Sequence, residues 1–357
     1  MKKTTTIVFL IFICTLLILN IVIADSEISF SERRTLKEFP ELNFDTLISG
    51  DFMKEFEPYL LDQMVFRDNF RQLKSWFELS VLNKNDVNDL FLENDHIFKL
   101  EYPYKPEMTE YFVEYINKIN EMYLKDNQVY ISLIPDKNYF LDEAYLKIDY
   151  IKMIDEIKSS DMTYIDIFQT LSLEDYYTTD PHWRQENLSE VIEMLSKEMN
   201  FEMKYQMHDY IQNSFEKFYG AYASQSGFRI DAEELLYLSH PDFEDLIIKN
   251  YEKSEATELY DIESLEGMDA YDVFLSGASP LIEIYNPNAN TTKELIIFRD
   301  SFGSSITPLL VGSYEKITLV DTRYVGAEYL DEFIEFSDQD VLFLYSTLVV
   351  NNSMMLK

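Results

Sequence analysis

One of the four histidines in this 357-residue chain lies in a segment whose residue types could do chemistry, "TTDPHWRQEN". Asp180 precedes His182 by two residues, so its carboxylate can reach and orient the imidazole. A serine nucleophile needs a base to take its proton, and the base needs such a carboxylate. The pair is suited to two of the three places in a catalytic triad. Two plainer alternatives are a half-buried histidine satisfied by Asp180, and an Asp180 that caps a helix starting near residue 184.

The serine that could complete a triad stands in "ELIIFRDSFGSS". Ser301 lies between an apolar run and a helical pattern, where its hydroxyl can project and the following backbone N–H groups can face an anion. Gly303, one of only eight glycines, lets the backbone approach a ligand closely. The alternative is that Asp300 or Ser301 only caps the next helix.

Other reactive side chains are scarce. Cys14 is the only cysteine and lies in an apolar N-terminal segment, so the region after it has no disulfide, thiolate metal site or cysteine nucleophile. The remaining histidines are scattered and lack the spacing of metal ligands: His96, His208 and His240. We therefore expect no metal and no cofactor, and an Asp-x-His metal pair at residues 180–182 is the weaker alternative.

The elements that must position these residues follow from the pattern after residue 86. Short apolar runs at 129–135, 162–168, 294–298, 316–321 and 341–345 alternate with helical patterns at 107–125, 142–158, 184–199 and 328–335. This alternation predicts an α/β fold, a mostly parallel sheet with helices on both faces. Ligands of such sheets gather beyond the carboxyl ends of the strands. Polar residues follow nearly every predicted strand: residues 136–138, 299–301, 321–324 and 346–347.

The N-terminal segment predicts the location of the protein. "MKK" precedes residues 7–24, which carry no charge, and Asp25 and Glu27 follow. Residues 1–24 therefore predict a transmembrane signal anchor that leaves the amino end in the cytoplasm and the body outside, at the cell membrane. A cleavable signal peptide is the alternative, because Val22 and Ala24 have the required small-residue spacing, and the body would then be secreted.

Two further regions complete the organisation. Residues 25–85 predict a polar connector followed by amphipathic helices between Thr46 and Leu82, broken near Pro58. Residues 86–357 form the main domain, with an acidic, weakly periodic insertion or lid near 200–270. The composition, 46% hydrophobic with a formal charge of −35, provides for a large core and repels nucleic acid and anionic headgroups. No nucleic-acid partner is expected.

At this point the chain resembles a known family. "TDPHW" with "FRDSFGSSITPLLVGSYEKITLVDTRY" resembles the DHHW proteins, which belong with the SGNH-hydrolase-like domains of bacterial alginate O-acetylation factors. "VNDLFLENDHIF", "IPDKNYF" and "YDVFLSGASPLIEIYNPNANTTKEL" are similar to other parts of that domain, and the resemblance covers roughly residues 60–350. It implies an SGNH-hydrolase-like fold in which Ser301 is the nucleophile, His182 the general base and Asp180 the orienting acid.

The sequence departs from the family pattern at two places. Pro181 replaces the first histidine of the DHHW motif, while His182, the triad position, is kept. Gly277-Ala278 stands where relatives tend to carry Gly-Asn, so an asparagine side chain is missing from the oxyanion hole. The resemblance then leaves the backbone N–H groups of Ser301, Gly303 and Gly277 as oxyanion donors.

The resemblance implies an extracytoplasmic O-acetyltransferase acting on a cell-surface polysaccharide, such as an exopolysaccharide of the cell envelope, through an acyl-enzyme on Ser301. A membrane-bound O-acyltransferase would supply the acetyl group. Lys137, Arg299, Arg323 and Tyr324 are candidates for substrate binding, with ion pairing at a polar rim as the alternative. Two other functions stay open: an SGNH-type carbohydrate esterase that uses water as acceptor, and a non-catalytic polysaccharide-binding scaffold of the same fold.

Overall fold

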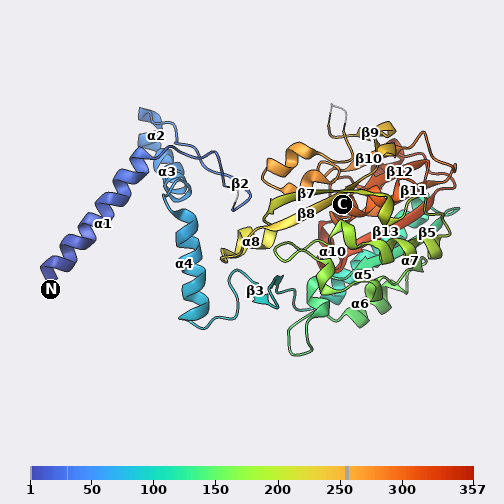
Figure 1. The fold of residues 1–357 in the computed structure, drawn as a ribbon, viewed down its shortest axis with the longest axis horizontal. Helices are drawn as coiled ribbons and strands as arrows, with labels where there is room; N and C mark the ends of the chain where they lie inside the picture. Colours follow the sequence, from blue (N-terminus) through green and yellow to red (C-terminus); the bar gives the residue numbers. More distant parts are fainter. Residues whose placement is uncertain (1, 30, 254–256) are drawn as a thin grey trace. The chain divides into compact units, whose positions relative to one another are not determined.

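A computed structural model describes residues 2–29, 31–253 and 257–357 (Figure 1). The chain divides into two compact units. The first comprises Met1–Asn88 and Ala223–Asp231, and the second comprises Asp89–Tyr222 and Ala232–Lys357.

The first unit begins with helix α1 (Lys2–Val22), whose apolar side chains are largely exposed. The helix is long and apolar enough to cross a membrane, and an N-terminal signal sequence has the same properties. The structure therefore supports an apolar N-terminal helix, while its anchoring and its topology stay predictions.

The rest of the first unit is mainly helical. The strands β1 (Ile28–Ser29) and β2 (Arg34–Thr35) pair with each other, and helices α2 (Phe44–Ser49), α3 (Asp51–Asp62) and α4 (Arg67–Ser80) follow. The predicted break near Pro58 is wrong, because Pro58 lies inside α3. The chain turns instead at Phe66, whose φ of 59° is left-handed. Residues 223–231 join this unit through the hydroxyl of Ser75, which donates to the carbonyl oxygen of Ser226 at 2.7 Å.

The second unit is built on a seven-stranded sheet in the order β6-β5-β13-β11-β12-β10-β9. The strands are β5 (Gln128–Ile134), β6 (Thr163–Tyr164), β9 (Ile247–Asn250), β10 (Leu281–Tyr285), β11 (Glu294–Arg299), β12 (Lys316–Val320) and β13 (Asp340–Ser346). From β6 to β12 all neighbours are parallel, and β10 runs antiparallel to both β12 and β9.

Side chains alternate between two buried layers, one on each face of the sheet. In β11, Leu295 and Ile297 belong to one apolar cluster, and Ile296 and Phe298 to the other. Helices α7 (Ser189–Met199) and α9 (Phe302–Leu310) contribute to the first cluster, and α5 (Pro106–Tyr123), α6 (Tyr150–Ile157) and α10 (Thr347–Val350) to the second. The predicted mostly parallel sheet with helices on both faces is confirmed.

Several predicted elements differ from the observed ones. Residues 162–168 form a strand of only two residues, and the helix expected at 142–158 is limited to α6, because its first half is an extended loop. The strand β10 was not predicted. The acidic stretch near 200–270 contributes β9 to the main sheet and a hairpin of β7 (Ile211–Phe218) and β8 (Glu233–Ser239). A second hairpin, β3 (Leu90–Glu93) and β4 (His96–Lys99), precedes α5.

Candidate active site

The turn between β11 and α9 carries the predicted nucleophile. Ser301 occupies the position before the helix but its side chain makes no capping hydrogen bond. Asp300 ties the turn instead, because Oδ1 accepts from the N–H of Phe302 at 3.0 Å and Oδ2 from the N–H of Ser346 at 2.8 Å. The second bond joins the ends of β11 and β13. Ser301 is thus held on a fixed turn with its hydroxyl uncommitted to the helix.

The structure brings Ser301 together with Asp180 and with His182, which precedes Ser301 by 119 residues in the sequence. The Oγ atom of Ser301 lies 2.7 Å from Nε2 of His182, and Nδ1 of the same ring lies 2.5 Å from Oδ1 of Asp180. A carboxylate only accepts hydrogen bonds, so Nδ1 carries the proton and Nε2 offers a lone pair to the serine hydroxyl. This is the arrangement that nucleophile activation requires. The catalytic roles of the three residues stay a prediction.

Neighbouring side chains fix the imidazole. The ring of Tyr271 stacks on that of His182, with centroids 3.9 Å apart and planes 10° from parallel. The indole N–H of Trp183 donates to the carbonyl oxygen of Phe302 at 3.2 Å and to Oγ of Ser305 at 2.9 Å. These bonds fasten the turn that carries His182 to helix α9. Sequence reasoning missed Tyr271, whose only signal was its place in the segment "YDVFLSGASP".

Asp180 is buried, with 1% of its surface exposed. Its second oxygen, Oδ2, accepts from the N–H of Ala221 at 2.8 Å. Gly220 passes so close that a Cβ there would lie 2.4 Å from Cβ of Asp180 and from the carbonyl oxygen of Thr179. Residues 220–221 therefore form a tight wall behind the carboxylate.

Lys137 was predicted to bind substrate, and its burial contradicts this. Only 3% of the residue is exposed, and Nζ donates to the carbonyl oxygens of Tyr177 at 3.0 Å and Thr178 at 3.2 Å. Burial lowers the pKa of Lys137 to about 7. The side chain supports the backbone leading to Asp180 from inside the domain.

Arg299 was also predicted to bind substrate, and it is fully buried. Its Nη1 lies 3.7 Å from Oδ2 of Asp321 and donates to the carbonyl oxygen of Asp300 at 3.3 Å. Arg323 binds the same Asp321 through two hydrogen bonds of 2.9 and 2.7 Å. Ion pairing with Asp321 therefore accounts for Arg299 and for the guanidinium group of Arg323. Tyr324, by contrast, is 50% exposed.

Two of the three predicted oxyanion donors already use their N–H groups within the fold. The N–H of Gly303 donates to the carbonyl oxygen of Asp300 at 3.1 Å, and that of Gly277 to Phe274 at 3.2 Å. Gly303 is required by packing, because a Cβ there would lie 2.6 Å from Cβ of Arg299. The N–H of Ser301 makes no hydrogen bond to any residue that the structure describes. Of the three predicted donors, only Ser301 keeps its N–H available in this structure.

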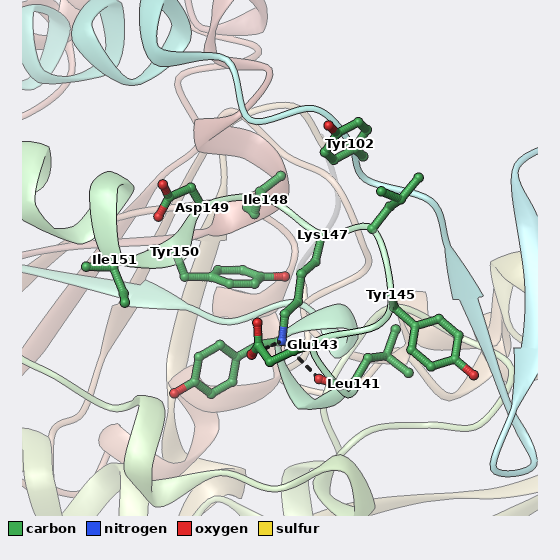
Figure 2. Close-up of a pocket in the computed structure, with 11 residues that line it drawn as sticks. Tyr102, Leu141, Glu143, Tyr145, Lys147, Ile148, Asp149, Tyr150 and Ile151 are labelled. Carbon is green, nitrogen blue, oxygen red and sulfur yellow. Dashed lines mark hydrogen bonds and ion pairs between the residues drawn. The ribbon is translucent and has the colours of Figure 1, made fainter.

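A pocket of about 660 Å³ lies in the loop region after β5, and Figure 2 shows its lining. The loop residue Lys147 points into it and donates to the carbonyl oxygen of Leu141 at 2.9 Å and to Glu143 at 3.0 Å. Tyr150 forms part of the wall, and its hydroxyl donates to Asp136 at the end of β5. The lining contains neither Ser301 nor His182, so the pocket is separate from the candidate active site.

No known family model matches the sequence, and no curated protein sequence matches it. The fold is similar to solved structures. A DHHW family protein from Eubacterium siraeum is 19% identical, with a TM-score of 0.62 over 76% of this chain and 95% of that one. Bacillus cereus PatB1 is 19% identical, with a TM-score of 0.60 over 76% of this chain and 99% of PatB1.

PatB1 has also been solved with a sulfonyl adduct, and that structure gives 18% identity and a TM-score of 0.58 over 74% of this chain and 98% of that one. Likeness at this level of identity speaks for the fold alone. The predicted SGNH-hydrolase-like architecture is thereby confirmed, and the chain has the fold of the DHHW family protein and of PatB1.

Proposed function

We propose that this protein is an O-acetyltransferase that acts outside the cytoplasm and moves an acetyl group to a hydroxyl of a cell-surface polysaccharide. The observation that carries the proposal is the pair of hydrogen bonds linking Ser301 to His182 and His182 to Asp180. They occur at the carboxyl end of a parallel strand, where ligands of this class of sheet bind. The fold shared with the DHHW family protein adds support.

The first half-reaction loads the enzyme. Oγ of Ser301 attacks the acetyl carbonyl carbon while Nε2 of His182 takes the hydroxyl proton. The tetrahedral intermediate carries its negative charge on the former carbonyl oxygen, which the N–H of Ser301 at the start of α9 stabilises. The intermediate collapses as the bond to the donor's leaving group breaks, and His182 returns the proton to that group. Acetyl-Ser301 remains.

The second half-reaction passes the acetyl group on. A sugar hydroxyl gives its proton to Nε2 of His182 and attacks the ester carbonyl. The intermediate then releases Oγ of Ser301, which recovers the proton. Asp180 keeps Nδ1 protonated and stabilises the imidazolium at both steps. Water in place of the sugar would make the same residues an esterase.

The donor and the acceptor enter as part of the proposal. An acetyl donor outside the cell must arrive through the membrane, so a membrane-bound O-acyltransferase is the proposed partner, and α1 would hold the domain at the cell membrane. Removal of α1 as a signal peptide would release it. For acceptor binding, Tyr324 and the exposed part of Arg323 stay candidates, because Lys137 and Arg299 are enclosed.

The full chain in detergent tests the proposal. It is incubated with 4-nitrophenyl acetate, and acetyl-Ser301 is sought by peptide mass spectrometry before and after adding an oligosaccharide. Ser301→Ala should take no acetyl group, and Ser80→Ala, an exposed serine at the end of α4, serves as the matched control. Acetylated sugar supports the transferase, and release of acetate alone supports the esterase. A wild type that takes no acetyl group from any donor yet binds the polysaccharide would establish the scaffold instead.

A further inference from the structure

We infer that Glu233, the first residue of β8, is a positioning residue that sets the orientation of the Asp180 carboxylate from within the acidic insertion. The inference rests on the proposed function, because Asp180 is the link between Glu233 and the reaction. Glu233 is half-buried and lies 53 residues beyond Asp180 in the chain. It touches none of the reacting atoms.

The carboxylate of Glu233 holds the two peptide N–H groups that lie directly before Asp180. Oε2 accepts from the N–H of Thr178 at 2.9 Å, and Oε1 accepts from the N–H of Thr179 at 2.8 Å. Oε1 also accepts from the hydroxyl of Thr179. Arg184, two residues after His182, donates to Oε2 at 2.6 Å. One side chain thus grips the loop on both sides of the Asp180–His182 pair.

The carbonyl side of the same backbone is also held. The carbonyl oxygens of Tyr177 and Thr178 accept from Nζ of Lys137, and that of Thr179 accepts from the N–H of Tyr222 at 3.0 Å. With both faces of these peptides bonded, the direction of the Asp180 side chain depends on the loop staying where Glu233 holds it. The sequence suggested that the insertion near 200–270 could be a lid. Through Glu233 it instead supports the loop that carries Asp180 and His182.

A glutamine at this position would keep the size of the side chain but would have one accepting oxygen in place of two. Its amide has one accepting oxygen and an NH2 group that only donates. If the NH2 group takes the place of Oε2, both donors that Oε2 now serves, the N–H of Thr178 and the guanidinium of Arg184, would face another donor, and the loop would relax locally. The distance between Oδ1 of Asp180 and Nδ1 of His182 would then vary, which weakens His182 as a base without removing any reacting group.

The experiment compares labelling of Ser301 by a sulfonyl fluoride, followed by intact mass, in the full chain. Glu233→Gln is paired with Glu234→Gln, which makes the same change at the exposed neighbouring residue. Each is made in the wild type and in an Asp180→Asn background, whose slow residual labelling is followed over days. Glu233→Gln should slow labelling about tenfold in the wild type and no further in the Asp180→Asn background, because the two residues act through one another. Glu234→Gln should change neither rate.

The outcomes separate the inference from the function. A wild type that takes no label overturns the proposed function. A labelled wild type with equal slowing by Glu233→Gln in both backgrounds shows a merely structural role, and no slowing at all shows no role. Circular dichroism checks folding of each variant. Should Glu233→Gln fail to fold, Glu233→Asp keeps the charge with a shorter reach, and its smaller slowing should likewise disappear in the Asp180→Asn background.

Discussion

The ends of two neighbouring strands, β11 and β12, look alike in sequence and differ in the structure. Each apolar strand leads into charged and hydroxyl residues, at 299–301 and 321–323. The end of β11 presents a half-buried Ser301 in contact with a base. The end of β12 folds inward, and Asp321 is fully buried between the guanidinium groups of Arg299 and Arg323.

The difference shows that polarity after a strand predicts a polar rim but does not say which part of it meets a ligand. At β12 the charges satisfy one another, since a buried carboxylate must be paired. At the end of β11 both carboxylate oxygens of Asp300 accept hydrogen bonds from backbone N–H groups. The hydroxyl of Ser301 makes no capping bond, so it can contact His182. Variants at the two ends should therefore fail in different ways.

The largest effect is expected at the end of β11. Ser301→Ala deletes the acyl acceptor, so acetyl-enzyme and sulfonyl labelling should vanish, while the free energy of unfolding changes by about 1 kcal/mol at most. His182→Ala should lose nearly as much activity, because triad members act as a unit, and Asp180→Asn should lose less. Acetylation kinetics with urea unfolding on the same samples checks this. Full activity in folded Ser301→Ala would remove the distinction between the two ends.

Asp321→Asn should produce the opposite pattern. It leaves the fully buried Arg299 and the half-buried Arg323 without their anion, so the free energy of unfolding should fall by about 3–5 kcal/mol. Arg299→Met should cost less, because Asp321 keeps both bonds from Arg323, and the change removes two nitrogens of Arg299 that have no hydrogen-bond partner among the described residues. Labelling of Ser301 per folded molecule should stay near that of the wild type in both. Unfolding curves that rank the two variants the other way would contradict the assignment.

Gly303→Ala should affect both strand ends, lowering the free energy of unfolding and also slowing the labelling of Ser301. The new methyl group would meet Cβ of Arg299, so overpacking should cost about 1–3 kcal/mol. Relief requires α9 to shift against β11, which moves Ser301 relative to His182, and labelling should therefore slow as well. Gly326→Ala is the control, since its nearest contacts are 3.2 Å or more. Unchanged labelling with lost stability would show that the serine turn is independent of the ion cluster.

The smallest effect concerns Lys137, a buried amine that follows β5. Its pKa is about 7 in the folded chain against an ordinary 10.5, so the unfolded chain binds more protons between these values. The free energy of unfolding should therefore rise with pH above 7, by at most about 1.4 kcal/mol per unit, and Lys137→Met should lack this rise. Urea unfolding at pH 7, 8 and 9 measures it, below the range where tyrosines titrate. Parallel profiles for both proteins would contradict the buried, neutralising amine.

The sequence predicted the long apolar strands well, because strands buried on both faces of a sheet are short runs rich in β-branched and aromatic residues, as in "VYISLIP", "ELIIF", "KITLV" and "VLFLY". It missed β10, "LIEIY", whose glutamate interrupts the apolar run and pairs with Lys316 at 2.5 Å. The short β6 was overextended because "YIDIF" continues the alternation after pairing has ended. Both errors come from tertiary neighbours that local pattern cannot show.

The residues of the candidate site likewise fall into those that local sequence could locate and those that depend on tertiary neighbours. Ser301, His182 and Asp180 could be found because their chemistry demands particular residue types near element ends. Lys137 and Arg299 were misplaced, since residue type says nothing about whether a strand-end cation points outward or into the core. Tyr271 and Glu233 were missed because a ring that stacks on a histidine, or a carboxylate that supports its loop, can lie at any sequence distance from it. Their roles depend on the hairpin and loops of the insertion, which sequence periodicity left undefined.

The central place of β13 has a consequence for how the protein is made. It is the last strand of the sheet in chain order, yet it lies between β5 and β11, and Ser346 at its end supplies the N–H that Asp300 accepts. A nascent chain that already contains the serine, the histidine and the aspartate still lacks the strand that aligns them. Such an order, with contacts between distant residues, favours slow closure of the sheet. A ribosome-bound or truncated chain ending before residue 340 should therefore not react with acyl donors, so that this reactivity arises only after β13 has been synthesised.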